Sequence, residues 1–559
     1  MADVPAPSSS SAFSFRLTPP PDPSSPRFGP LLGHARLTRP DGSPDLTIDT
    51  PGLLTTTSRG VVPHLSRDHH RAADAVRWVN IPFETFLEQV PPVPTLQGGA
   101  HPLHTFLGFP PARNTLVMAL RDPACARELP PNGNDHVAAL TLRGVRKVSA
   151  SDWRAYVAAC NPDLVVALSD TPHTPPPHSQ KRLTKSLARS AAWLADLLRP
   201  FPPPPDSASP ATTTTTTARE THPLNVLVHM AGGPSAPARA AFAESLVEPL
   251  YGPDAALVAP LPTLDAGVAG YTFDLVPLRT AEPPAPITDL LRASLAPLPR
   301  GKLRMVNAPA SPHEILRLVR DVGVDVFDAA WAQDAASIGV ALDFVFPVPT
   351  SASGAVVEKG ELGHNLYDDK YAMDFSRLAD ALRAGRDSTS TSTSTMPVCP
   401  CAACSPRAPA THIAHSALDH LSFPSPSPTS ASAAQEQEHL PPLTRAYLHH
   451  LLHTHEMSAH ALLALHNLAV LDAFFAGIRA VLSDGSGREG FEEEVARFEE
   501  EVERFAGAYD EGMGVVGRAR GMWRGVDRAR GKGRLARERD AQAGAGAEVP
   551  AGETIITVD

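Results

Sequence analysis

Short apolar runs recur between Asn114 and Trp331 and alternate with segments whose apolar residues have helical spacing. The runs are rich in β-branched residues and contain few polar residues, which is typical of strands buried on both faces. They read NTLVMAL, HVAALTL, PDLVVALS, LNVLVHM, GYTFDLVPL, KLRMVNA and VDVFDAAW. This pattern predicts a buried, mainly parallel sheet.

Helical patterns lie between several of these runs. Ser149 and Asp152 have the spacing of a capping box, and Ser311 precedes Pro312 and Glu314 at the start of another helix. Segments such as QKRLTKSLARSAAWLADLL and APARAAFAESLVEPL have the spacing of further helices. Six or more strand–helix units favour an α/β fold, and the length fits a closed (β/α)8 TIM barrel better than an open sheet.

The C-terminal third is helical in pattern. LTRAYLHHLL begins a long apolar segment, and Phe491, Val495, Phe498, Val502 and Phe505 then recur every three or four residues among glutamates. This spacing predicts an acidic amphipathic helix within 486–512. The strongly basic segment that follows belongs to a tail, 513–559, which we expect to be disordered and solvated; the alternative is an arm that contacts RNA.

Low-complexity segments divide the chain. Sixty prolines, an aromatic content of 6% and tracts of Ser and Thr indicate long polar insertions, whereas an apolar content of 42% is enough for a core. The expected organisation is a disordered lead at 1–26, a barrel at 27–385 with a disordered insertion at 200–221, and a metal-binding helical subdomain at 386–485 with insertions at 386–396 and 422–438.

Charge and cysteine content narrow the class of protein. The net charge of −11 argues against a protein that coats nucleic acid, and we expect no DNA partner. Five cysteines do not form a disulfide framework. The N-terminus has no continuous apolar segment of the signal-peptide type, and the apolar stretch HNLAVLDAFFAGIRAVL is interrupted by Asp472 and Arg479 and reads as too short to span a bilayer. We expect a cytoplasmic protein, with peripheral attachment to the mitochondrial outer membrane as an alternative.

Three of the five cysteines, Cys399, Cys401 and Cys404, lie within six residues. Cys-x-Cys-x-x-Cys lets thiolates converge on one thiophilic ion, for which Zn²⁺ is the default; the alternative is three incidental loop cysteines. Spacing does not select a fourth ligand, because many histidines lie downstream, among them His412, His415, His439, His449, His450, His453, His455, His460 and His466. His449 and His453 lie four residues apart and could themselves bind a metal, although a histidine-rich helix packed on the barrel is the simpler interpretation.

The segments LTRAYLHHLL and ALHNL, which follow this cysteine motif, resemble the zinc subdomain of the tRNA-guanine transglycosylase family. On this resemblance the fourth ligand is His466, and one closed, structural Zn²⁺ is implied per subunit. The family exchanges guanine for queuine, in eukaryotes, at the wobble position of tRNAs with GUN anticodons. NPDLVVALSD places Asp170 at the family's purine-binding aspartate, and GVDVFDAAW places Asp328 at its nucleophile.

Other family motifs are missing from this sequence. No counterpart of the Asp-Ser-Gly-Gly-Phe-Gln segment is present; the purine-binding glutamine is replaced by Ala231, a Gly-Gly pair by Phe273-Asp274, and the Pro-Thr-Arg loop by AAWAQDAAS. These departures resemble the non-catalytic branch of the family. They imply a chain with no catalytic and no cofactor-binding residue, which forms a heterodimer with a catalytic paralogue and helps to position tRNA.

Two other hypotheses remain open at this point. In one, the chain is an active transglycosylase or glycosidase with altered specificity, in which Asp328 is the nucleophile and Asp170 or Asp325 the second carboxylate. In the other, it is a stand-alone zinc and RNA-binding module, which the acidic charge and the few aromatic residues count against.

Overall fold

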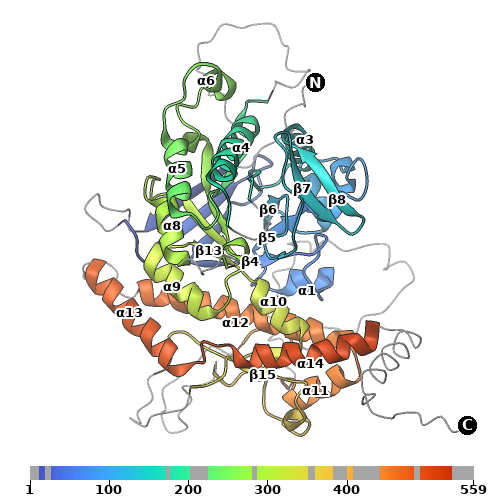
Figure 1. The fold of residues 1–559 in the computed structure, drawn as a ribbon. Helices are drawn as coiled ribbons and strands as arrows, with labels where there is room; N and C mark the ends of the chain where they lie inside the picture. Colours follow the sequence, from blue (N-terminus) through green and yellow to red (C-terminus); the bar gives the residue numbers. More distant parts are fainter. Residues whose placement is uncertain are drawn as a thin grey trace, which may run out of the picture.

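Eight parallel strands form a closed barrel, so the predicted (β/α)8 TIM barrel is confirmed (Figure 1). The computed structural model describes residues 12–18, 20, 27–171, 177–201, 224–279, 286–349, 359–381, 399–406, 441–483 and 491–531. The predicted insertions at 386–396 and 422–438, residues 202–221 of the third insertion, and residues 532–559 of the tail lie outside these ranges.

The barrel strands follow one another in chain order apart from a hairpin. They are β4 (Gly52–Thr56), β5 (Trp78–Pro82), β6 (Thr115–Ala119), β9 (Leu164–Val166), β10 (Val226–His229), β11 (Val268–Asp274), β12 (Leu303–Asn307) and β13 (Val326–Asp328), with β13 pairing back to β4. The run HVAALTL was expected among the parallel strands, but it forms β7 (His136–Thr141), which pairs antiparallel with β8 (Gly144–Ser149) outside the barrel.

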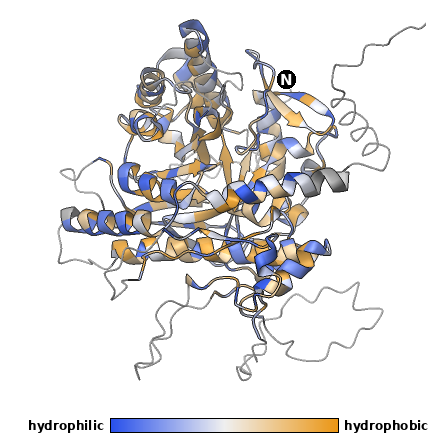
Figure 2. Ribbon diagram, turned by 60° about the horizontal axis from the view of Figure 1, so that its bottom comes forward, coloured by the Kyte–Doolittle hydropathy of each residue, from blue (hydrophilic) through white to orange (hydrophobic). Residues whose placement is uncertain are grey.

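Helices surround the barrel and begin where the sequence predicts. The strand connections contain α1 (Arg67–Ala72), α2 (Pro102–Leu107), α3 (Ala150–Cys160), α4 (Gln180–Leu198), α5 (Ala236–Val247), α6 (Gly252–Val258), α7 (Val276–Arg279), α8 (Ile287–Leu295), α9 (Pro312–Val322) and α10 (Ala330–Ser337). The Ser149–Asp152 capping box is present, and the Ser311 side chain accepts from the backbone amide of Glu314. Hydrophobic strands fill the centre, and the surrounding helices carry hydrophilic residues (Figure 2).

A small antiparallel sheet closes the amino-terminal end of the barrel. It consists of β1 (Ala12–Thr18), β2 (Leu32–Thr38) and β3 (Leu46–Thr50). Phe13 and Phe15 of β1 pack against the barrel interior, where the Phe13 and Trp78 rings lie 6.1 Å apart, and the Phe13 backbone amide donates to Asn225 Oδ1 at 3.2 Å. The expectation of a disordered lead over 1–26 is therefore wrong for 12–18, because alternating Phe13, Phe15 and Leu17 supply an apolar face.

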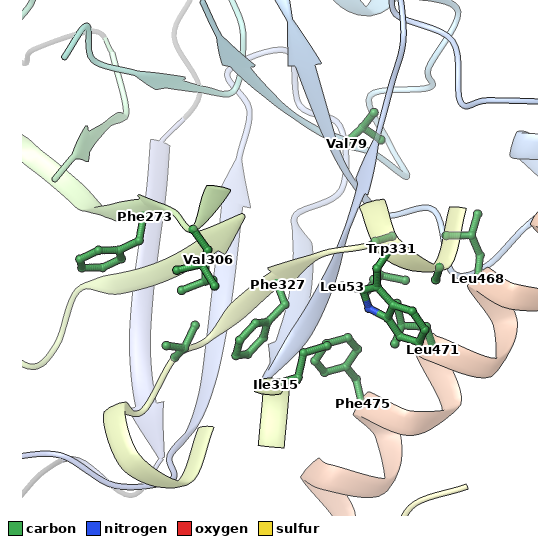
Figure 3. Packing of buried hydrophobic residues seen from close by; sticks show 14 of the residues in the cluster. Leu53, Val79, Phe273, Val306, Ile315, Phe327, Trp331, Leu468, Leu471 and Phe475 are labelled. Atoms are coloured by element: carbon green, nitrogen blue, oxygen red, sulfur yellow. The ribbon is translucent and has the colours of Figure 1, made fainter. Parts of the chain in front are cut away.

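The helix α12 (Met457–Ser483) lies beside β4 and α10 and carries the apolar stretch that was predicted to be too short for a membrane span. At 27 residues it is long and apolar enough by length and composition to cross a bilayer, but many of its side chains are buried within the protein. Leu468, Leu471 and Phe475 face Trp331 and Leu53 of the barrel region (Figure 3), and the Phe475 and Phe327 rings stack at 5.9 Å. In this position α12 serves as a core helix of the barrel.

The remaining elements flank α12. They are β14 (Val340–Leu342), β15 (Gly363–Asn365), α11 (Arg445–His453), α13 (Phe491–Ala508) and α14 (Gly514–Gly531), with short 3-10 turns at Phe83–Phe86, Val93–Leu96, Asp265–Gly267 and Asp369–Tyr371. The acidic helix α13 buries the apolar face that the sequence predicted, since Phe498, Val502 and Phe505 are buried.

The basic tail was expected to be disordered from residue 513, and the structure corrects this expectation. Residues 514–531 form α14, in which Val515, Val516 and Ala519 are buried and the Trp523 ring lies 5.6 Å from that of Tyr367. Five glycines and five arginines within α14 make this apolar stripe hard to recognise in the sequence.

Candidate functional site

Cys399, Cys401, Cys404 and His466 lie together in the structure, each buried, with their ligand atoms within 4.8 Å of one another. The three Sγ atoms are 3.6, 3.5 and 3.4 Å from His466 Nδ1. A tetrahedral Zn²⁺ with Zn–S of about 2.3 Å and Zn–N of about 2.1 Å requires roughly 3.6 Å between sulfur and nitrogen. The donor set and its spacing therefore fit one thiophilic ion with four protein ligands.

Residues of β14 and α10 orient the histidine of this Cys3His cluster. His466 Nε2 contacts the Leu342 carbonyl at 2.9 Å, which leaves Nδ1 to face the thiols. The next residue, Asn467, accepts from the Leu342 amide at 2.9 Å and donates to the carbonyls of Ala332 and Val340, both at 3.0 Å. Of the histidines named as candidates, His412, His415 and His439 lie outside the described residues, and among the others His466 is the one that joins the cysteines.

Asp170, at the position of the purine-binding aspartate, is fully buried and its carboxylate is occupied by neighbouring side chains. Arg182 donates to both oxygens at 2.6 and 2.8 Å, Arg189 donates at 2.9 Å, and Asn132 Nδ2 donates at 2.8 Å. Burial alone would raise the pKa of Asp170, but these hydrogen bonds hold that pKa below its ordinary value. The carboxylate is ionised and serves as the centre of an arginine clamp.

Asp328, at the position of the nucleophile, ends β13 and is fully buried. Its oxygens accept from the backbone amides of Ala308 at 2.7 Å and Ala330 at 3.2 Å. Burial raises the pKa of Asp328 to about 7. A carboxyl group that is protonated, or whose oxygens accept hydrogen bonds from backbone amides, is a poor nucleophile.

Asp325 lies at the opposite end of the same strand, where its side chain accepts from the Arg304 amide at 2.7 Å. Three residues of strand separate it from Asp328 by about 10 Å, at roughly 3.3 Å per residue. The structure therefore does not bring Asp325 and Asp328 together as a pair of catalytic carboxylates.

A pocket lies at the carboxyl ends of the barrel strands, where catalytic sites of this fold are found. Its described lining includes Asp122, His229, Asp274 and Asn307, and includes neither Asp170 nor Asp328. His229 Nε2 is 2.9 Å from Asp274 Oδ2, and Asn307 Nδ2 donates to Asp274 Oδ1 at 2.9 Å. Three polar groups of the lining thus interact with one another, and apolar residues such as Val117, Leu168 and Met305 form much of the rest.

Asp274 could be recognised from the sequence as a departure from the family, whereas Asp122, His229 and Asn307 were not among the predicted site residues. A signal was available, because His229, Asp274 and Asn307 are each the last residue of a barrel strand. A polar residue directly after an apolar run marks the carboxyl end of the barrel.

The segment that replaces the Pro-Thr-Arg loop forms α10 and packs inward. Trp331 is 6% exposed, and Gln333 bonds the end of β4, accepting from the Thr56 amide and donating to its carbonyl, both at 3.0 Å. This segment is fixed in the fold and does not form an exposed loop.

The sequence was compared with known proteins. A model of the queuine tRNA-ribosyltransferase family matches residues 33–417 and 439–502, and the gap between these ranges contains the predicted insertion 422–438. A protein of Schizosaccharomyces pombe is 26% identical over 453 residues, covering 81% of this chain and 78% of its own length. A relative from Xenopus tropicalis is 26% identical over 445 residues, covering 79% of this chain and 91% of its own length. A relative from Caenorhabditis elegans is 23% identical over 464 residues, covering 82% of this chain and 97% of its own length. All three relatives are named queuine tRNA-ribosyltransferase accessory subunit 2. With the family model matching most of its length, and with a closed barrel beside a Cys3His cluster, this chain belongs to the queuine tRNA-ribosyltransferase family.

Proposed function

We propose that this chain is the non-catalytic accessory subunit of a heterodimeric queuine tRNA-ribosyltransferase. Together with a catalytic paralogue it supports the exchange of guanine for queuine at the wobble position of GUN-anticodon tRNAs, in the cytoplasm. The observation that carries this proposal is the contrast between two sites: the Cys3His ligands are complete, whereas Asp170 and Asp328 are occupied by the protein's own groups.

Base exchange requires a carboxylate that can reach the ribose C1′ and a second acid or base beside the leaving purine. Asp328 and Asp170 are both buried, and neither lines the pocket in the described part of the chain. Opening either group would leave amide or guanidinium donors without partners in the interior, which is costly. These contacts support a structural role for both aspartates.

The Cys3His cluster fits Zn²⁺ in a structural role. Four protein ligands complete a tetrahedral shell, so no position is left for a water or a substrate. When bound, the ion would hold the 399–406 loop against α12, and the residues that would hold it are Cys399, Cys401, Cys404 and His466.

An exposed apolar patch near the Cys3His cluster suits a protein partner. Met373 is 77% exposed, Phe375 70% and Tyr447 45%. The two segments that carry these side chains are adjacent, because the Ala446 amide donates to the Asp374 carbonyl at 2.8 Å. Clustered exposed apolar side chains, aromatic ones above all, are typical of interfaces.

The first test is incorporation of labelled guanine into a GUN-anticodon tRNA by this chain, by the catalytic paralogue, and by the two mixed. We expect exchange in the mixture and none from this chain alone. Asp328→Asn should leave the exchange rate of the mixture unchanged, because the Asp328 carboxyl is buried, accepts from backbone amides and does not itself line the pocket. Exchange by this chain alone, lost in Asp328→Asn, would show an active enzyme.

The patch is tested by Phe375→Asp in co-purification with the catalytic paralogue. A buried charge at an interface centre costs several kcal/mol, so we expect at least a tenfold loss of affinity. Leu142→Asp is the matched control, since Leu142 is 76% exposed in the β7–β8 turn, away from α11 (Figure 1). Equal binding by wild type and Phe375→Asp would place the partner elsewhere.

A further inference from the structure

We propose that Asp369, His449 and His453 form a second metal site, on the surface, that binds a divalent transition ion of the Zn²⁺ class. The three side chains each offer a ligand atom, and these atoms lie within 4.8 Å of one another. His449 and His453 come from α11 one helical turn apart, while Asp369 begins the 3-10 turn Asp369–Tyr371 that faces this helix. None of the three belongs to the Cys3His cluster.

Backbone carbonyls orient both imidazoles. His449 Nδ1 is 2.9 Å from the Leu366 carbonyl and His453 Nε2 is 3.3 Å from the Tyr367 carbonyl, so these nitrogens carry the protons and donate. The other nitrogens, His449 Nε2 and His453 Nδ1, then have lone pairs available for a ligand bond. A carbonyl bonded to the far nitrogen is the usual support of a metal-binding histidine.

The donor set selects the class of ion. Two imidazole nitrogens and one carboxylate oxygen suit Zn²⁺, Co²⁺ or Ni²⁺, whereas Mg²⁺ and Ca²⁺ prefer oxygen ligands alone. The nearest basic side chain in sequence, Lys370, lies 3.8 Å from Asp368 and over the Tyr371 ring, so it has other partners than Asp369. Asp369 and His453 are exposed and His449 is half-buried, which leaves room for water ligands.

A bound ion would join two parts of the chain. The carbonyls of Leu366 and Tyr367 and the carboxylate of Asp369 belong to the segment after β15, whereas the histidines belong to α11, about 80 residues later. The site would thereby cross-link this segment to the helix, next to the exposed Met373.

Metal content of the full chain tests the proposal. The stripped protein is dialysed against a fixed free Zn²⁺ concentration that saturates the wild type, and zinc is measured per chain. We expect two equivalents for the wild type, one for His453→Ala, and two for His450→Ala, an exposed histidine of the same helix outside the cluster. Asp369→Asn, also at an exposed position, should weaken binding of the second equivalent at least tenfold.

Co²⁺ substitution separates the two sites by absorption. The Cys3His cluster gives thiolate-to-cobalt charge-transfer bands, which we expect to be equal in the wild type and in His453→Ala. The surface site adds only weak visible bands, which should disappear in His453→Ala and remain in His450→Ala. One zinc equivalent in the wild type, or a second equivalent kept by His453→Ala or lost by His450→Ala, would overturn the proposal.

Discussion

Replacing Cys401 by serine is expected to release the ion from the Cys3His cluster and to unfold the 399–406 loop. The loop is short, and few other contacts hold it: the Leu443 amide donates to the Ala403 carbonyl at 2.8 Å, and Ser405 Oγ donates to the Cys399 carbonyl at 2.8 Å. The free energy of binding a structural Zn²⁺, about 10–16 kcal/mol in small zinc domains, is free energy of folding. Losing one of four ligands should remove most of it.

The measurement combines zinc per chain with the thermal unfolding midpoint. Cys401→Ser should lose the tightly held zinc and should show a lower midpoint, as should the wild type after chelation. Cys125→Ser is the control, because Cys125 is a partly exposed thiol outside the cluster. If Cys401→Ser kept its zinc and its midpoint, the cluster would not be a metal centre of the fold.

Replacing Asp163 by alanine is expected to destabilise the barrel by about 3–5 kcal/mol, the usual cost of leaving a buried charge without its partner. Asp163 precedes β9 and is 2% exposed. It accepts from Arg39 at 3.0 Å, from His104 Nε2 at 2.8 Å and from the Leu116 amide at 2.9 Å. The substitution leaves Arg39, which is 3% exposed, buried without a carboxylate partner, with only the carbonyls of Pro111 and Asn114 to accept from it.

Chemical denaturation of the full chain measures this loss. Asp74→Ala is the matched control, because Asp74 pairs with Arg113 at 3.0 Å with side chains 81% and 48% exposed, and such surface pairs contribute about 0–1 kcal/mol. Equal midpoints for the Asp163 and Asp74 variants would contradict the role of the buried network.

The loss of stability caused by Asp163→Ala should also depend on pH. Burial alone would raise the pKa of Asp163, but His104, Arg39 and the Leu116 amide hold that pKa below its ordinary value. An acid with a lowered folded pKa stabilises the fold above its unfolded pKa of about 3.9 and loses this contribution as the pH falls through the folded pKa. The difference between wild type and Asp163→Ala should therefore shrink below about pH 4.

Much of the barrel could be predicted because its strands are continuous apolar runs and its helices carry caps. Two barrel strands could not be predicted this way: β4, GLLTT, has only two aliphatic residues beside a glycine and two threonines, and β5, WVNIP, contains an asparagine and a proline that weaken the strand pattern. Pairing of β4 with β13 joins residues about 270 positions apart, and a local pattern does not contain this contact. The same holds for Phe13, whose partner Asn225 is 212 residues away.

For the site, the three cysteines could be predicted from spacing, whereas His466 came from the family resemblance, since spacing alone did not choose among the many downstream histidines. The missing motifs predicted that the pocket had changed. They did not predict that Arg182 and Arg189 bind the Asp170 carboxylate, because both arginines belong to α4, which begins ten residues after Asp170. The charges of these arginines fit an ordinary solvated helix face until the fold places them on the aspartate.

The position of α12 has a consequence for synthesis on the ribosome. The side chains of Leu53, Phe327 and Trp331, where β13 pairs with β4, are covered by a helix that ends only at Ser483. This helix is therefore synthesised long after both strands have left the ribosome. Until then these apolar surfaces are open to water and to other chains, the state in which large nascent proteins aggregate. A nascent chain of this protein should therefore bind chaperones until residues 457–483 have left the exit tunnel.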